Sequence, residues 1–427
     1  MGLFIIDYIY VGIDDTDSPD GMCTTYLCMD LIKKLKKEGY IIEGYPRLIR
    51  LNPFARYKTR GNGGVSFKFP KKQFESKDLK KAKDIILDEV TKLSMFECNN
   101  TNPGVVFYDG KITKEMEDFA YKALHAIITI EEAEEFADRI GAEIYKFKKG
   151  RGIIGSLATI SCKLTDCTYE LLTYRIPDNR GLKRKIDYDS VYLMDKKTDT
   201  FENVDGKYIA IEPKTPCPVL YGIRANDPDS LLEAKEIVKV YEEIEDYCIF
   251  LTNQHTDMHL EPADNIKSMK KYSSYIVTGI VKDKPHPIEG GHFFFTLEDS
   301  TGVIECAAYE PTKSFRKIVH KLRFGDKIKV YGGIGEEGTF IIEKFHVLSL
   351  NNIEYKNPKC PNCGKTLSSA GKNKGFKCKN CSYKSNDLSK VPYKIQRDLT
   401  LNKFYETPVM ARRHLAKPLC RMDLDMI

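Results

Sequence analysis

Two Cys-x-x-Cys pairs in the last quarter of this sequence constrain its fold more than any other feature. Cys360 and Cys363 stand in CPNC, Cys378 and Cys381 stand in CKNC, and residues 364–377 separate the pairs. Tetrahedral Zn²⁺ takes four soft ligands, and a Cys-x-x-Cys turn directs two thiolates at one point. Four thiolates leave no coordination position for water. The spacing therefore predicts a structural Zn²⁺ site in a zinc ribbon over residues 353–386.

The predicted ribbon is also the most basic part of the chain. It contains eight lysines and a single acid, Glu354, which gives a local charge of +7 against +6 for all 427 residues. Positive charge concentrated in one module indicates a polyanion partner such as nucleic acid. The alternative is a lysine-rich surface that only aids solubility.

The composition is that of a soluble, multidomain protein. Hydrophobic residues make up 42% and charged residues 30% of the chain, and no apolar run approaches the ~18 residues of a membrane span. The first residues are expected to form a strand and not a signal peptide. Thirteen cysteines, mostly inside apolar patterns, indicate a reducing, cytoplasmic location without disulfides. We expect no membrane association and no obligate protein partner.

Three aspartates follow the first predicted strand, residues 8–13, and precede a predicted helix over 23–38. Asp14, Asp15 and Asp17 thus stand where α/β sheets bind their ligands, beyond the carboxyl end of a strand. Carboxylates this close repel one another unless a cation joins them. Mg²⁺ fits, because it binds through one or two carboxylates together with substrate phosphates. The alternative is a capping turn in which Asp17 and Ser18 satisfy backbone N–H groups.

Several other residues predict phosphate binding near this cluster. Thr24 and Thr25 begin the helix, whose N-terminus attracts anions, although their hydroxyls could instead cap it. GRGIIG, residues 150–155, matches GxGxxG, but the next strand ends in an arginine and not in an acid, so we expect a phosphate-friendly turn without dinucleotide binding. Residues 46–64 form a long, basic connection expected to be a functional loop. Its candidate phosphate ligands are Arg47, Arg50, Arg56, Lys58 and Arg60, with a solvated loop as the alternative.

The periodicity divides the chain into five regions. Residues 1–62 and 150–268 are predicted to form a split α/β catalytic region, interrupted by a ferredoxin-like α+β domain at 63–149. Within these regions we expect a short strand at 41–44, a helical segment at 113–140 and an ordered loop at 215–230. Five strands with a helix between the third and fourth predict an OB-fold at 269–352. The ribbon and a basic tail at 387–427 follow.

Two further segments are candidates for RNA contact. Strand alternation turns Phe294 to the face opposite Phe293 and Phe295, where it could stack on a base; the alternative is that all three belong to the core. ARRHLAKPL, residues 411–419, places Arg412, Arg413, His414 and Lys417 in the basic tail, which we expect to contact RNA and not merely to be solvated.

Six motifs, in this order along the chain, resemble those of the archaeal 2-agmatinylcytidine synthetases (agmatidine synthases, the TiaS family). They are VGIDDTDSPDGMCTTYL, PRLIRLNP, YKTRGNGGVSF, GRGIIGSLA, TPCPVLYGIR and ARRHLAKPL. The resemblance implies an ATP-dependent ligase that converts the wobble cytidine of the CAU anticodon of an isoleucine tRNA to 2-agmatinylcytidine. ATP would phosphorylate the ring-2 carbonyl oxygen, agmatine would displace the phosphate, and the product would read AUA.

The resemblance also assigns roles to residues. It implies an unusual kinase domain whose autophosphorylated threonine is Thr24, with Asp14, Asp15 and Asp17 holding Mg²⁺ and the ATP phosphates. Gly64 is a small departure, expected only to loosen the turn before it. The residues expected to bind ATP or phosphate are Thr16, Ser18, Thr25, Lys58, Arg60, Asn62, Gly150 and Gly152.

The agmatine site is less constrained by the sequence. A guanidinium group binds a planar carboxylate well. TPCPVLYGIRANDP contains Asp227, so Thr215, Gly222 and Asp227 are predicted to line this pocket. The amine must lose a proton before it attacks, and the N-terminal motifs contain no histidine to accept it.

Two other functions fit parts of the sequence. A non-catalytic single-strand-binding protein could be built from the same OB-fold and ribbon, and would bind RNA without consuming ATP. An aspartyl-phosphate phosphohydrolase would use Asp14 as its nucleophile, and would lose its phosphate label on Asp14→Asn but not on Thr24→Ala.

Overall fold

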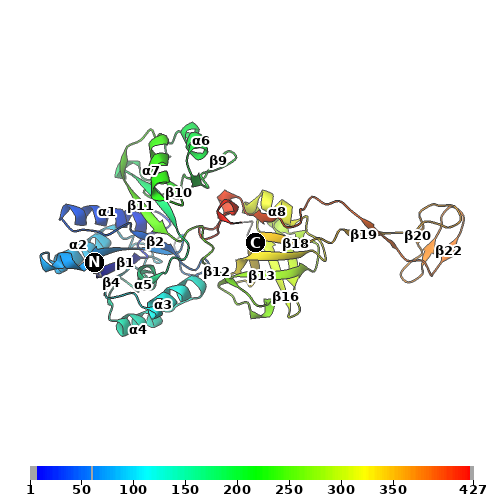
Figure 1. Cartoon of the computed structure of the whole chain (residues 1–427), viewed down its shortest axis with the longest axis horizontal. Helices are drawn as coiled ribbons and strands as arrows, with labels where there is room; N and C mark the ends of the chain where they lie inside the picture. The colour runs from blue at the N-terminus through cyan, green and yellow to red at the C-terminus, as the bar shows by residue number, and fades with distance from the viewer. Residues whose placement is uncertain (1–6, 59–60, 424–427) are drawn as a thin grey trace, which may run out of the picture.

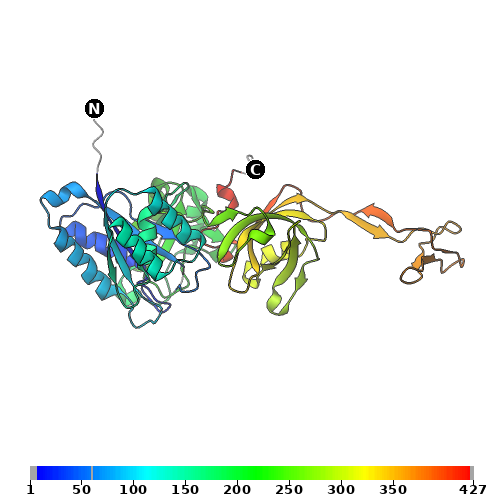
Figure 2. The same cartoon turned by 90° about the horizontal axis from the view of Figure 1, so that it is seen from below.

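A computed structural model describes residues 7–58 and 61–423 of the chain. The molecule is elongated. An N-terminal half, a barrel and a small distal module follow one another along its long axis, and the tail returns to the junction between the first two (Figures 1 and 2).

The N-terminal half is built on one nine-stranded sheet. Its order is β5-β4-β1-β3-β2-β11-β6-β10-β7, and all neighbours are antiparallel except β2 and β11. The strands are β1 (Tyr8–Asp14), β2 (Arg47–Arg50), β3 (Gly63–Pro70), β4 (Gly104–Asp109), β5 (Glu143–Lys146), β6 (Thr168–Arg175), β7 (Thr200–Phe201), β10 (Val219–Ala225) and β11 (Ile244–Thr252).

Helices cover both faces of this sheet. On one face, α1 (Thr24–Lys37) and α2 (Leu79–Leu93) bury apolar side chains against alternate residues of β1, β3 and β4. On the other face pack α3 (Lys114–His125), α4 (Ile130–Ile140) and α5 (Ile153–Ser161). At the far end of the sheet, α7 (Pro228–Ile237) packs on β10 and on α6 (Tyr188–Lys197), and α6 packs against the small hairpin of β8 (Val204–Asp205) and β9 (Tyr208–Ile209).

The sheet corrects how the N-terminal half was expected to divide. Residues 63–149 have no sheet of their own, because β3 and β4 pair with β1 on either side. The physical reason is that β1 is buried on both faces, with Val11 and Ile13 buried on one face and Gly12 on the other, and a buried strand needs a hydrogen-bonding partner along each edge.

Three predicted secondary-structure segments also differ from the structure. Residues 41–44 form no strand, and Ile41 is exposed, whereas the expected loop at 46–64 contains β2 and the start of β3. The expected helical segment 113–140 is two helices, because Thr129 starts α4 with a capping box. The expected loop 215–230 contains β10, an inner strand, since its three prolines flank the strand and do not interrupt it.

The barrel agrees with the expected OB-fold. Its strands are β13 (Ser273–Val281), β15 (Phe293–Glu298), β16 (Val303–Ala308), β17 (Lys327–Ile334) and β18 (Phe340–Ser349), and α8 (Ser314–Val319) lies between the third and fourth. Closure comes from β13–β15 and parallel β16–β18 pairing. Short strands β12 (Leu260–Pro262), β14 (His286–Pro287) and β24 (Phe404–Glu406) extend this sheet.

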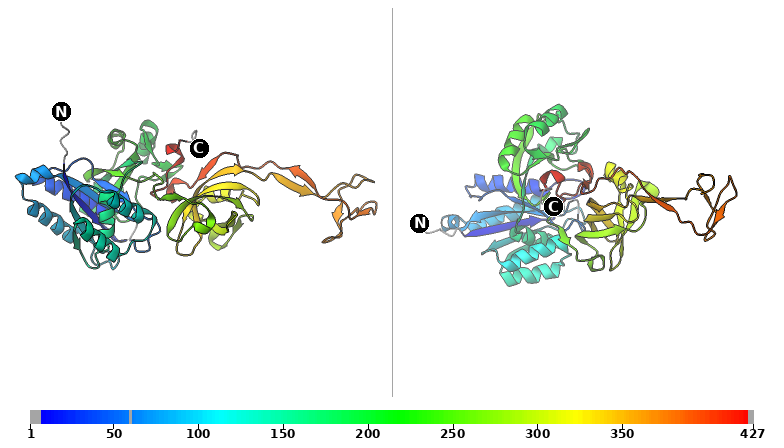
Figure 3. Two further views of the ribbon diagram at one scale, coloured as in Figure 1. Left: turned by 60° about the horizontal axis from the view of Figure 1, so that its bottom comes forward. Right: turned by 45° about the vertical axis from the view of Figure 1, so that its right-hand side comes forward.

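The distal module stands on a two-stranded arm. β19 (Ile353–Lys356) and β23 (Val391–Lys394) form the arm, and β20 (Ser368–Ser369), β21 (Phe376–Lys377) and β22 (Lys384–Ser385) form the module (Figure 3). Its own small core contains Leu367 and Phe376. Among the helices of residues 7–58 and 61–423, none has the length and apolar composition to cross a membrane.

Candidate functional site

A cavity of about 710 Å³ opens where β1 ends and α1 begins. The segment between β2 and β3, the start of α5, strand β10 and the tail also line it, so parts distant in sequence converge here. Of the residues singled out in the sequence, it brings together Asp14, Asp15, Asp17, Thr24, Thr25, Lys58, Asn62, Gly152, Thr215, Gly222 and His414.

Asp14 and Asp15 are held close together at the end of β1. Burial raises the pKa of the Asp14 carboxyl to about 8, and the neighbouring Asp15 adds to the shift. Asp15 adopts a left-handed conformation (φ 62°) and accepts a hydrogen bond from Arg151 Nη2 at 2.7 Å. Burial raises the pKa of Asp15 to about 6, although Arg151 opposes the shift. A bound cation would favour both carboxylates in their ionised form.

Two glycines make room for the Asp14 side chain. An added Cβ at Gly155 would lie 1.8 Å from Asp14 Oδ2, and one at Gly64 would lie 2.9 Å from Asp14 Cβ. Gly64 therefore lies inside β3 against Asp14, which corrects the expectation that it only loosens a turn. The glycine pair that opens β3 was the available signal for this close approach.

The GRGIIG turn packs against β1. A Cβ at Gly152 would meet the Asp14 carbonyl oxygen at 2.4 Å, whereas Gly150 takes a positive φ (65°) beside Lys146 and does not line the cavity. The turn therefore brings the N-terminus of α5 up to Asp14, and only Gly152 of the expected pair reaches the site.

Thr24 is the first residue of α1 and is buried. Its hydroxyl accepts a hydrogen bond from Thr16 Oγ1 at 3.0 Å, so Thr16 supports Thr24 from behind and does not line the cavity. The N-cap residue is Cys23, whose side chain makes no capping hydrogen bond. The helix N-terminus therefore faces the cavity without a side-chain cap. The N-cap alternative for Thr24 and Thr25 does not describe this structure.

Ser18 and Asp227 have local structural roles. The Ser18 hydroxyl accepts a hydrogen bond from the Asp20 N–H at 3.1 Å, which closes the turn and matches the capping alternative. Asp227 is the N-cap of α7 and accepts from Ser230 N at 2.9 Å, and that bond holds its pKa below the usual range. Neither residue lines the cavity.

Another buried carboxylate of the cavity is Glu170 of β6, which the sequence analysis missed. It pairs with Arg224 Nη2 of β10 at 2.8 Å, and both residues line the cavity. An acid in the middle of an otherwise apolar strand, TYELLTYR, was the signal that could have identified it.

The basic residues of β2 and of the segment that follows it differ in where their side chains lie. Arg50 and Lys58 line the cavity, and burial lowers the pKa of each. Arg47 is directed away and donates to the Ile160 carbonyl at 3.0 Å, so it joins β2 to α5. Arg56 lines the rim of the cavity and is largely exposed. Arg60 lies outside the described residues.

The cations of the tail mostly form ion pairs within the protein. Arg412 Nε lies 2.6 Å from Glu202, Arg413 Nε lies 3.1 Å from Glu343, and Lys417 Nζ lies 2.7 Å from Asp166. Their acidic partners belong to the N-terminal half and the barrel. These side chains therefore join the two parts of the protein, and their contact with RNA stays a prediction. His414 is the exception and lines the cavity.

On the barrel, Phe294 is half-buried and packs edge-on against Tyr309, with ring centroids 6.1 Å apart. Phe295 is buried in the core. The predicted alternation is thus present, and the stacking role of Phe294 stays a prediction.

The four ribbon cysteines converge as expected. Their sulfur atoms all lie within 4.8 Å of one another, with Cys360 and Cys378 buried and Cys363 and Cys381 at the surface. Four thiols gathered at one point fit a tetrahedral Zn²⁺ ion.

Comparisons with known proteins agree with this geometry. Family models match along the chain as the TiaS TCKD domain (residues 10–149), the TiaS FLD domain (150–259), an OB-fold nucleic acid binding domain (274–348) and the TiaS C-terminal zinc ribbon domain (357–399). The isoleucine-tRNA 2-agmatinylcytidine synthetase TiaS of Methanocaldococcus jannaschii is 45% identical, over 97% of this chain and 99% of its own. That of Pyrococcus horikoshii is 46% identical, over 96% of each.

Solved structures match over nearly the whole chain as well. A crystal structure of TiaS in complex with an isoleucine tRNA and ATP superposes with a TM-score of 0.88 at 40% identity, covering 98% of both chains. A complex of TiaS with an isoleucine tRNA, AMPCPP and agmatine superposes with a TM-score of 0.86 at 39% identity, with the same coverage.

Proposed function

The chain belongs to the TiaS family of isoleucine-tRNA 2-agmatinylcytidine synthetases, and from this membership we propose how its own residues carry out the reaction. It is an ATP-dependent enzyme that forms agmatidine on an isoleucine tRNA, with ATP, agmatine and the tRNA as its substrates. The observation that carries the assignment of roles is the cavity, which gathers three aspartates and Thr24 at the open N-terminus of α1.

The aspartate cluster is the proposed site for Mg²⁺ and the ATP phosphates. The charge of Asp15 makes ionisation of the neighbouring Asp14 more costly, and a divalent cation would relieve that repulsion. Carboxylate oxygens are also the donor set that Mg²⁺ prefers. When bound, Mg²⁺ would neutralise phosphate charge. The N–H groups at the start of α1 add favourable dipole electrostatics on the same side of the cavity.

Two transfers of the γ-phosphoryl group are proposed. Thr24, the first residue of α1, is placed to receive it in autophosphorylation, with Thr16 fixing the orientation of its hydroxyl. In the main reaction, the ring-2 carbonyl oxygen of the wobble cytidine attacks the γ-phosphorus and ADP leaves. Arg151, Arg50 and Lys58 line the same cavity and supply positive charge where negative charge develops on the phosphoryl oxygens.

The second step is displacement by agmatine. Phosphorylation converts a poor leaving oxygen into phosphate, so the amine can replace it at ring carbon 2. Thr215 and Gly222 remain proposed as walls of the agmatine pocket, and the buried Glu170 replaces Asp227 as the carboxylate on that side of the cavity. A guanidinium group pairs with such a buried carboxylate in a planar, bidentate arrangement.

The other modules hold the tRNA. The lysine-rich ribbon at the end of its arm supplies a surface for the RNA backbone, and the OB-fold barrel lies between the ribbon and the N-terminal half (Figure 1). This arrangement suits a tRNA that is bound at a distance from the nucleotide that reacts. Phe294 is the proposed stacking platform on the barrel.

Incorporation of labelled agmatine tests these roles. An unmodified transcript of the isoleucine tRNA, ATP and Mg²⁺ should give labelled tRNA with the wild-type protein, and a methionine tRNA with the same CAU anticodon should give none. Asp17→Ala and Thr24→Ala should each lower incorporation by about 100-fold or more, since both alter the phosphoryl-transfer site. Intact RNA binding without any label from the wild-type protein would contradict the proposal and favour a binding protein.

A further inference from the structure

The tail is anchored on both sides of the junction between the N-terminal half and the barrel. Residues 404–421, the tail strap, start as β24 on barrel strand β18 and then cross to the segment after β11. There, His255 N donates to the His414 carbonyl at 2.7 Å and Asp257 N donates to the Leu415 carbonyl at 2.8 Å. These backbone hydrogen bonds fix the position of residue 414.

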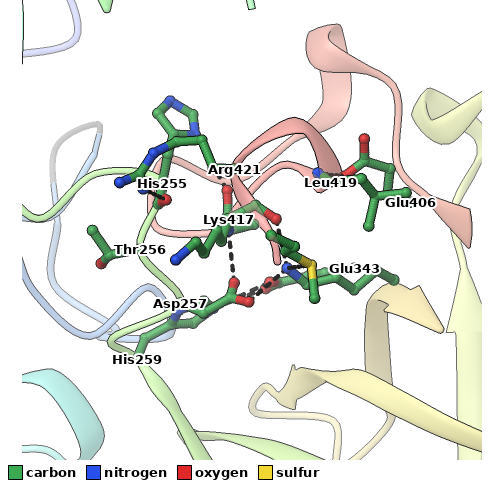
Figure 4. A network of polar contacts seen from close by, with 12 residues as sticks. His255, Thr256, Asp257, His259, Glu343, Glu406, Lys417, Leu419 and Arg421 are labelled. Atoms are coloured by element: carbon green, nitrogen blue, oxygen red, sulfur yellow. Dashed lines mark hydrogen bonds and ion pairs between the residues drawn. The ribbon is translucent and has the colours of Figure 1, made fainter. Parts of the chain in front are cut away.

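A buried ion pair fastens the strap (Figure 4). Lys344 of β18 is fully buried, and its Nζ contacts Asp257 Oδ2 at 2.6 Å and the Lys417 carbonyl at 2.6 Å. Figure 4 labels Asp257 and Lys417. Lys417 N donates to the other oxygen of Asp257 at 2.7 Å. Lys417 is three residues from His414 along the strap. The pair of Lys344 with Asp257 joins the barrel to the segment after β11, the two parts on which the strap lies. The backbone at His414 is therefore held rigidly.

The His414 side chain takes no part in this anchoring. Its imidazole makes no hydrogen bond or ion pair with the described residues, and it lines the cavity beside Gly61, where solvent reaches it. Among the described residues it is the only histidine that lines the cavity. A rigid backbone that presents to a reaction cavity an imidazole not bonded to any described residue suits proton transfer.

Two carboxylates of the cavity lining and the nearby His255 have partners of their own. Glu170 is paired with Arg224, and Asp15 is paired with Arg151. Arg50 lines the cavity and interacts electrostatically with His414 as well as with Asp17 and Glu170. His255, on the segment below the strap, is buried and bonded to the Ala416 carbonyl.

We propose that His414 is a catalytic residue that accepts the proton of the agmatine amine in the displacement step. The inference rests on the proposed function. The imidazole nitrogen first takes one proton from the agmatine ammonium group and later releases it to solvent. The amine nitrogen then forms a bond to ring carbon 2, the bond from that carbon to the phosphorylated oxygen breaks, and phosphate leaves with the electron pair. The second proton of the attacking nitrogen passes to the departing phosphate or to solvent.

The charges around the imidazole suit this role. The Arg50 guanidinium holds the pKa of His414 well below its usual range, and the protein walls around the cavity and Arg224 act in the same direction. The imidazole is therefore unprotonated, and able to accept a proton, when substrates arrive at neutral pH. Phosphate groups bound near Arg50 would offset its charge and make the imidazole a stronger base.

The test is agmatine incorporation by full-length His414→Gln between pH 7 and pH 9. At pH 7, kcat should fall about 10²-fold or more, the usual contribution of a general base. The loss should shrink as pH rises, because solution then supplies the unprotonated amine. Autophosphorylation of Thr24 and KM for tRNA should change less than about twofold, since the backbone anchoring is intact. His286→Gln, an exposed barrel histidine, should match wild type.

Hydroxylamine, which is unprotonated at neutral pH, gives a second readout. With it as the nucleophile, His414→Gln and wild type should differ by less than about fivefold at pH 7. A loss that is independent of pH, or an equal loss of Thr24 phosphorylation, would overturn the inference. So would a Lys58→Gln variant that shows the pH-dependent defect in place of His414→Gln. Failure of the wild-type protein to incorporate agmatine would refute the proposed function itself.

Discussion

At the scale of single residues, the site depends on Gly155 having no side chain. The Asp14 carboxylate occupies the space beside Gly155 that any side chain would fill, so the aspartate cluster and the first turn of α5 fit only because that residue has no Cβ. Here a glycine sets the position of a charged group.

Gly155→Ala should therefore disable the enzyme. Its Cβ would lie 1.8 Å from Asp14 Oδ2, and the carboxylate must move. Displacing a reacting group by about 1 Å costs about 10²-fold in rate, so transfer of the γ-phosphoryl group to Thr24 should fall by about that factor. Gly302→Ala, where a Cβ meets nothing within 4 Å, is the matched control. Equal activity of the two variants would contradict the role given to Gly155.

The raised pKa values of Asp14 and Asp15 predict how stability depends on pH. Each carboxyl binds its proton more tightly in the folded protein than in the unfolded one, where its pKa is 3.8. Their contribution to stability is therefore present below pH 4 and is lost as pH rises through 6 and 8. Without divalent cations, the thermal midpoint should fall between about pH 5 and pH 8, and Asp14→Asn should reduce that fall. Mg²⁺ at pH 8 should restore the wild-type midpoint and leave that of Asp14→Asn unchanged.

At the scale of elements, the sequence predicted best where the pattern is local. The barrel strands alternate, β1 ends at the aspartates, and the cysteine pairs converge, each within a few residues of the expected position. The sequence-based prediction failed where strands far apart in the sequence pair with each other. Residues 63–149 alternate strands and helices as a separate domain would, and nothing local indicates that β3 and β4 both pair with β1.

The same division holds for the candidate site. Asp14 and Thr24 could be identified because strand end and helix start adjoin in sequence. Glu170 stands out only as an acid inside an apolar strand, and its partner Arg224 could not be identified, because the two meet only when β6 and β10 pair. His414 was found for another reason, as a basic tail residue. The sequence does not show that the strap turns Arg412 and Lys417 toward acids and His414 toward the cavity.

The ribbon is an element whose structure depends on its metal. Its core contains Leu367 and Phe376 and two of the four cysteines, which is too little apolar surface to fold alone. Cys363→Ser should therefore unfold residues 357–399 and raise KM for tRNA about tenfold or more, because the lysine surface is lost. Thr24 phosphorylation should stay within about twofold of wild type. Zinc content and tRNA titration check this, and an unchanged KM would place tRNA binding elsewhere.

At the scale of the whole molecule, one buried charge pair joins two domains. Asp257→Asn should leave Lys344 buried without its counter-charge and cost about 3 kcal/mol at the junction. Combining it with Lys344→Met should recover more than half of that loss, because the pair is then replaced by apolar contact. Thermal unfolding of the single and double variants measures both effects. Additive losses would show that the two side chains do not act together.

The path of the strap affects the stage of synthesis at which the enzyme becomes complete. A ribosome makes the N-terminal half first, and that half can begin to fold as it emerges. Its cavity stays without the His414 imidazole until the barrel and the ribbon have also been synthesised, because residue 414 follows both. A nascent chain that already holds the aspartates and Thr24 thus lacks the group proposed for agmatine transfer. The chain then becomes able to modify tRNA only once the modules proposed to bind the tRNA are also present.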